Sequence, residues 1–105
     1  MEEKSPISQD ALIVFIKSVL LKIENVEKLM AQDPPTHIPA YNKLLGINIK
    51  FEDLPRESKQ WFFPQMVMTR GVITLFLNGR YSDGLKQLST IKKDLIKIVK
   101  DLENV

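Results

Sequence analysis

Few side chains in this chain of 105 residues are of the types that build catalytic or metal sites. His37 is the only histidine, and the sequence contains no cysteine. A zinc site needs several histidine or cysteine ligands at set spacings, which this sequence does not supply. A nucleophile–histidine–acid triad would need His37, yet no serine or threonine lies in a nucleophile motif. We therefore predict no metal site, and a solvated loop position for His37.

Three carboxylates lie close together in the sequence, at Glu52, Asp53 and Glu57. General acid–base pairs are built from such groups, but helix capping accounts for Asp53 and solvation accounts for the two glutamates. The four glycines are scattered, and the sequence has no glycine-rich nucleotide loop, P-loop or EF-hand loop. We predict no catalytic residue, no cofactor and no small-molecule substrate, and hence that the protein is not an enzyme.

A row of basic residues near the C-terminus is a candidate for binding phosphate groups. At about 100° per residue, its four lysines fall within about 60° of one another on one helix face. Such a row can follow a nucleic-acid backbone, and its predicted binding residues are Arg80, Lys86, Lys93, Lys97 and Lys100. Aspartates flank the row and no aromatic residue is interleaved with it. A solvated face with ion pairs along the helix is therefore the competing interpretation.

The apolar residues of both ends of the chain follow a helical period. In residues 8–31 they are spaced by 4, 3, 4, 3 and 4 residues, which predicts a helix capped by Ser5 or Ser8: Leu12, Ile16, Val19, Ile23, Val26 and Met30. Ser82 is the predicted cap of a last helix that runs to the C-terminus. Its apolar stripe is formed by Leu85, Leu88, Ile91, Leu95, Ile98, Val99 and Leu102.

The middle of the chain is interrupted by prolines and glycines. The segment 32–39 ends the first helix because it holds three prolines. We expect a short helix over 39–45, stopped at Gly46, and then an extended segment over 47–51 with Ile47, Ile49 and Phe51 turned inward. Helical sequence resumes at 55 and is broken or bent near Pro64, for example into helices over 55–62 and 64–78. Residues 78–80 form the next turn.

These elements predict an all-α fold, a small single-domain helical bundle with three long helices plus one or two short ones. Residues 1–7 are expected to be a flexible N-terminus and residues 8–105 the domain. The N-terminus is acidic, unlike a signal peptide. The most apolar run, residues 11–23, is too short to span a bilayer and contains two lysines. We expect a cytoplasmic protein with no membrane partner.

The stretch QWFFPQMVMTR, residues 60–70, holds more large apolar residues than one helix face needs. Treated as one helix, it predicts Trp61, Phe62, Met66 and Met68 in the core. It leaves Phe63 and Val67 beside Arg70 on another strip. An aromatic, an aliphatic and an arginine side chain together have the composition of a protein-binding hot spot.

The first helix has a thinner apolar surplus opposite its core stripe, at Val14 and Leu21. These two residues are predicted to contact a partner or a second copy, or else the short helix over 39–45. The leading interpretation is a non-catalytic helical interaction protein, a homodimer or a small accessory subunit of a larger assembly, which binds another protein or itself. The alternative is a nucleic-acid-binding bundle that uses the lysine row.

Overall fold

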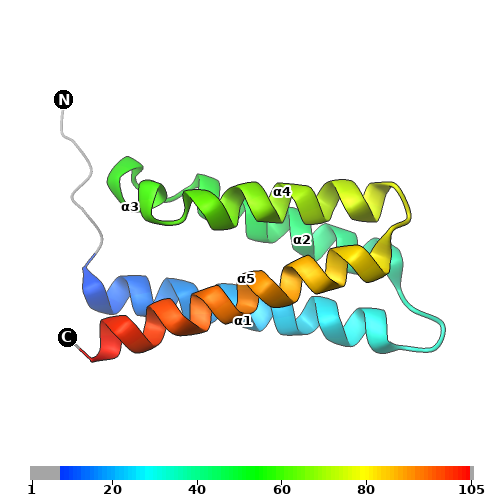
Figure 1. The fold of residues 1–105 in the computed structure, drawn as a ribbon, viewed down its shortest axis with the longest axis horizontal. Helices are drawn as coiled ribbons and strands as arrows, with labels where there is room; N and C mark the ends of the chain where they lie inside the picture. The colour runs from blue at the N-terminus through cyan, green and yellow to red at the C-terminus, as the bar shows by residue number, and fades with distance from the viewer. Residues whose placement is uncertain (1–7, 105) are drawn as a thin grey trace.

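A computed structural model describes residues 8–104, and within them the chain forms five helices (Figure 1). The prediction for residues 1–7 lies outside the described residues. The helices are α1 (Gln9–Ala31), α2 (His37–Glu52), α3 (Arg56–Trp61), α4 (Phe63–Leu77) and α5 (Tyr81–Glu103). The prediction of a small all-α bundle is confirmed.

Helix α1 has the predicted start and the predicted inner face. Ser8 is its N-cap, and the Ser8 hydroxyl accepts a hydrogen bond of 3.2 Å from the backbone N–H of Ala11. Four residues of the apolar stripe are fully buried, namely Ile16, Val19, Ile23 and Val26. The helix ends before the proline-rich connection, as proline requires.

Helix α2 is longer than the predicted helix over 39–45. It also includes residues 47–51, so the prediction of an extended segment there was wrong. Ile47 and Phe51 continue the spacing of Ala40 and Leu44, so a helix buries all four on one side. Ile49 shares no such spacing and is 57% exposed. The alternation of residues 47–51 suggested a strand, but the period of the longer segment decides the structure because its buried face joins the core.

The chain breaks between α3 and α4 at Phe62, close to the predicted position. Pro64 lies in the first turn of α4, where its missing N–H costs no hydrogen bond. Phe62 is buried, but Trp61 is 68% exposed, so its predicted core position was wrong. The prediction assumes one helix over residues 60–70. The turn at Phe62 changes the direction of the helix axis, so the side chain of Trp61 in α3 does not share a face with the core residues of α4. Met66 is buried and Met68 partly buried, as expected.

Helix α5 begins at Tyr81, and the predicted capping role of Ser82 was wrong. Gly79 adopts a positive φ of 72°, which glycine reaches without strain. The Arg80 N–H then donates to the Leu75 carbonyl at 2.8 Å, closing the end of α4. Arg80 is the N-cap residue of α5. Its side chain makes no capping hydrogen bond and instead contacts Asp83 in the first turn.

The helices α1, α2, α4 and α5 alternate in direction around one core, with α3 as a short connector (Figure 1). Neighbouring pairs are α1 with α2, α2 with α4, α4 with α5, and α5 with α1. Near α3, the rings of Phe15, Phe51 and Phe62 form a cluster with centroid distances of 5.6–5.8 Å. None of these helices is both long and apolar enough to cross a membrane.

Candidate protein interface

The outward side of α4 carries a continuous strip at spacings of 4, 3, 4 and 3 residues: Phe63, Val67, Arg70, Thr74 and Leu77. At about 100° per residue these positions fall within about 80° of arc. All five are exposed. The exposed fractions of Phe63, Val67 and Leu77 are 61%, 48% and 65%. We call these five residues the α4 strip.

Two strip residues, Phe63 and Val67, are exposed beside Arg70 as the sequence predicted. Leu77 was missed because the projection placed it at the edge of a core side. The signal that identifies it is its distance of fourteen residues from Phe63, which is two heptads. Whether a partner binds these residues stays a prediction.

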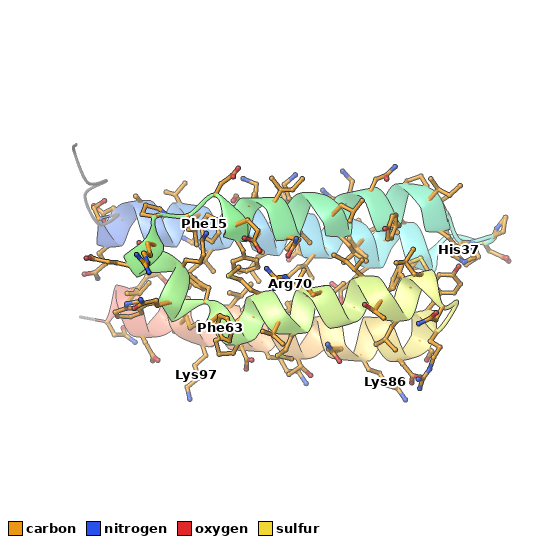
Figure 2. All side chains as sticks on the ribbon, turned by 90° about the horizontal axis from the view of Figure 1, so that it is seen from above. Phe15, His37, Phe63, Arg70, Lys86 and Lys97 are labelled. Atoms are coloured by element: carbon orange, nitrogen blue, oxygen red, sulfur yellow. The ribbon has the colours of Figure 1, made fainter. Side chains whose placement is uncertain are left out.

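Helix α2 lies beside α4 and adds two exposed isoleucines, Ile38 and Ile49, to the outer surface of the bundle. Figure 2 looks onto the side of the molecule formed by α2 and α4. Ile38 is 75% exposed. Sequence reasoning missed Ile49 because the segment that contains it was expected to be extended with this side chain inward.

A small charged cluster crosses from α2 and α3 to the middle of the strip. The Arg70 guanidinium forms a hydrogen-bonded ion pair with the Glu52 carboxylate, and Arg70 lies between α4 and α2 in Figure 2. The Lys59 ammonium lies 3.9 Å from the other carboxylate oxygen. Two cations therefore share one carboxylate, which leaves one net positive charge in the cluster.

A pocket of about 210 Å³ opens at the Leu77 end of the strip. It is lined by His37, Ile38, Tyr41, Phe76, Leu77 and Tyr81. The His37 and Tyr81 rings are stacked, with centroids 4.0 Å apart and planes 7° apart. His37 is thus the first residue of α2 and half-buried, and its predicted place as a solvated loop residue was wrong. Aromatic rings and aliphatic side chains dominate this pocket.

Val14 and Leu21 are exposed on α1, at 67% and 59%. They do not pack against α2, so that alternative is excluded for the described chain. Helix α1 neighbours α2 and α5 and lies diagonally across the bundle from α4. The two apolar surfaces predicted from the sequence therefore face different sides and do not form one site.

The lysine row is exposed on α5, opposite the buried side. Lys86 and Lys97 project away from the bundle in Figure 2. Within residues 8–104 none of Lys86, Lys93, Lys97 and Lys100 forms an ion pair, so the expected pairs with the flanking aspartates are not made. Arg80 is different, because its Nε and Nη2 atoms donate to Asp83 at 3.0 and 2.6 Å.

A half-buried ion pair joins α5 to α1 on the other side of the molecule. The Lys92 ammonium donates to the Glu27 carboxylate at 2.9 Å. This hydrogen bond raises the pKa of Lys92 above 10.5, partial burial opposes the rise, and the charges of Glu27 and Glu24 add to it. The pair therefore links the two helices.

No group of three or more histidine, aspartate or glutamate side chains within residues 8–104 is placed to hold a metal ion. Of the three clustered carboxylates, Glu52 is engaged by Arg70 and Lys59, while Asp53 and Glu57 are exposed. Comparison of the chain with protein-family models, with curated proteins and with solved structures found no match.

Proposed function

We propose that this protein is a non-catalytic helical interaction protein, a homodimer or a small accessory subunit of a larger assembly. It binds a protein partner through the α4 strip. The observation that supports this is the exposure of Phe63, Val67 and Leu77 on one face of one helix. An unpaired helix face of this composition gains free energy when a partner covers it, at about 25 cal/mol per Å² of apolar surface.

The strip also has the composition that binding hot spots favour. An aromatic ring, two aliphatic side chains and an arginine lie within four helical turns. Aromatic residues and arginine are enriched in hot spots because they bury large areas and arginine still offers directed hydrogen bonds. Pre-formed helices lose little backbone entropy on binding.

The first test is a comparison of proteins retained by the tagged wild-type chain and by Phe63→Asp from the native cell. A partner bound through the strip should be lost with Phe63→Asp, because a buried, unpaired carboxylate opposes association. Ile96→Asp is the matched control, since Ile96 is an exposed aliphatic residue on α5 and belongs to none of the predicted binding surfaces. Retention of the same proteins by all three chains, each folded by circular dichroism, contradicts the proposal.

Nucleic-acid binding through the lysine row is a second candidate, favoured by four exposed lysines without ion pairs among the described residues. Arg80 contributes less than expected because Asp83 occupies its guanidinium. Binding of labelled RNA or DNA should weaken steeply between about 50 and 200 mM salt, as counterion release requires. Affinity that is unchanged in a Lys93→Glu, Lys97→Glu variant removes this candidate.

A further inference from the structure

The charged cluster lies at the midpoint of the α4 strip. Phe63 precedes Arg70 by seven residues and Leu77 follows it by seven, so the apolar ends are symmetric about the guanidinium. Arg70 is the only charged residue of α4. A helix laid along the strip would therefore cover apolar surface on both sides of Arg70, over a length of about 21 Å.

Covering the strip removes water from the excess positive charge. Glu52 already balances one of the two cations, and the side chains of Arg70, Glu52 and Lys59 are 54%, 39% and 35% exposed. Desolvating an uncompensated charge is unfavourable, and a carboxylate supplied by the partner would compensate it. The cluster thus selects for a partner with an acidic residue at the centre of its apolar face.

A second copy of this chain does not meet that requirement on the same strip. A two-fold interface brings identical surfaces together, so positions near its centre face their own copies. Arg70 is the centre of the strip, and each copy would bring one net positive charge to the axis. Like charges would meet there without water, whereas α4 itself has no acidic residue to offer.

The pocket makes the Leu77 end of the α4 strip different from the Phe63 end. At about 210 Å³ it is smaller than the roughly 300–1,000 Å³ typical of small-molecule sites. This volume suits one leucine-sized or aromatic side chain. Tyr41, Phe76 and Tyr81 provide apolar walls, and burial of one anchoring side chain in such a pocket is how interfaces concentrate their binding energy.

We propose that the face formed by α4 with the α3–α2 charged cluster binds an amphipathic helix of another protein. The apolar face of the partner helix carries a central aspartate or glutamate that contacts Arg70 and Lys59. One terminal apolar side chain of the same helix enters the pocket. This inference rests on the proposed function, of which it specifies the partner. It is a helix-in-groove mode of recognition in which the apolar anchors follow helical spacing.

Synthetic helical peptides of about 18 residues, or five turns, test this chemistry directly. The acidic peptide repeats the spacing of the strip with four leucines around a central glutamate, and its other faces are polar. A second peptide has lysine in place of the central glutamate. Trp61 is the only tryptophan, is exposed and lies two residues before Phe63, so its fluorescence reports binding.

We expect the acidic peptide to bind at least about tenfold more tightly than the lysine peptide. Arg70→Glu should reverse that preference, and Ile96→Asp on α5 should leave both affinities unchanged. Alanine in place of one terminal leucine should weaken binding more than alanine in place of the other, because only one end meets the pocket. Amide chemical shift changes should concentrate on α4, α3 and the pocket residues.

Equal affinity for the two peptides, or an unchanged preference in Arg70→Glu, overturns the acidic-partner inference. No binding up to about 1 mM peptide overturns it as well. Each of these three results leaves the proposed function standing if Phe63→Asp still abolishes retention of a cellular protein. A dimer in sedimentation that Phe63→Asp dissociates identifies a second copy as the occupant, which overturns the inference and keeps the proposed function.

Discussion

Helices α4 and α5 pack side by side and bury apolar stripes in the same core, yet their outward faces differ. The outward face of α5 carries Lys86, Lys93, Lys97 and Lys100, all solvated. The outward face of α4 carries Phe63, Val67 and Leu77 around one arginine. Packing within the chain accounts for the apolar pattern of α5 except at Ile96, which is 37% exposed, but for only part of that of α4.

The difference shows how much a helix sequence says about its surroundings. In α5 the apolar positions match the side that the bundle covers, so charge and hydropathy locate both sides of the helix. In α4 large apolar residues occupy both the covered and the uncovered side. A partner that covers the second apolar side would account for these residues, and this is the basis of the proposed function.

The largest expected effect separates the two sides of α4 at adjacent residues. Phe62 is 1% exposed and touches the rings of Phe15 and Phe51, whereas Phe63 is 61% exposed. Phe62→Ala should lower the free energy of unfolding by about 3–5 kcal/mol, because it removes a ring and leaves a cavity. Phe63→Ala should change it by less than about 0.5 kcal/mol. Urea denaturation followed by circular dichroism measures both values.

If Phe63→Ala were as destabilising as Phe62→Ala, Phe63 would belong to the core. The contrast between α4 and α5 would then disappear, because the apolar surplus of α4 would be satisfied within the chain.

A smaller effect is expected at the seam between the two helices. A Cβ atom built on Gly84 would lie 2.8 Å from the Phe76 ring, while one built on Gly46 in α2 meets nothing within 4 Å. Gly46→Ala should stabilise the protein by about 1 kcal/mol, the helix propensity difference. Gly84→Ala has the same intrinsic gain but must displace a buried ring, so it should be about 1–3 kcal/mol less stable than Gly46→Ala.

Equal melting temperatures of the two alanine variants would mean that α4 and α5 are not held as closely as described. Gly84→Val, which adds two methyl groups to the Cβ atom, extends the same measurement and should be less stable than Gly84→Ala.

The smallest effect concerns the side of α5 that faces α1. Lys92→Gln should lose at most about 1 kcal/mol, since the Lys92–Glu27 pair is only half-buried. Lys17→Gln is the matched control, because its pair with Glu103 at 3.6 Å is more exposed and should contribute almost nothing. Chemical denaturation of the three chains at neutral pH gives the comparison.

The Lys92 effect also has a defined dependence on pH. The folded pKa of Lys92 is raised above 10.5, so its charge is retained more strongly in the folded than in the unfolded chain. The stabilisation is fully present below the unfolded pKa and is lost as pH rises through the folded value. The stability difference between wild type and Lys92→Gln should therefore persist at about pH 8 and shrink as pH rises above the pKa of the unfolded lysine. A difference that grows with alkaline pH would contradict this pairing.

Sequence periodicity alone predicted α1 and α5 closely, because long stripes at helical spacing leave one interpretation. It failed for α2, where residues 47–51 alternate locally but Ile47 and Phe51 also continue the helical spacing of Ala40 and Leu44. Short windows fit both periods, and only the tertiary burial of Phe51 distinguishes them. Trp61 was misplaced for a related reason. The turn at Phe62 separates α3 from α4, so the helical spacing of α4 does not give the position of a side chain in α3.

The candidate site was predictable in part. The exposure of Phe63, Val67 and Arg70 followed from their shared helix face. The contacts that Glu52 and Lys59 make near that face could not be predicted from the sequence. These two residues belong to α2 and α3, and their positions depend on how the helices pack. The pocket likewise joins His37 to Tyr81 across 44 positions of sequence, which no local pattern records.

The N-terminal half of α1 and the last turn of α5 are held side by side, by the Gln9 amide that donates to the Leu102 carbonyl and by the Lys17–Glu103 pair. A load applied at these two points would pull across the α1–α5 seam rather than along it. The seam would then open like a zipper, one helical turn after another, at low force. Tension carried through both ends would therefore separate α1 from α5 and expose their core sides first.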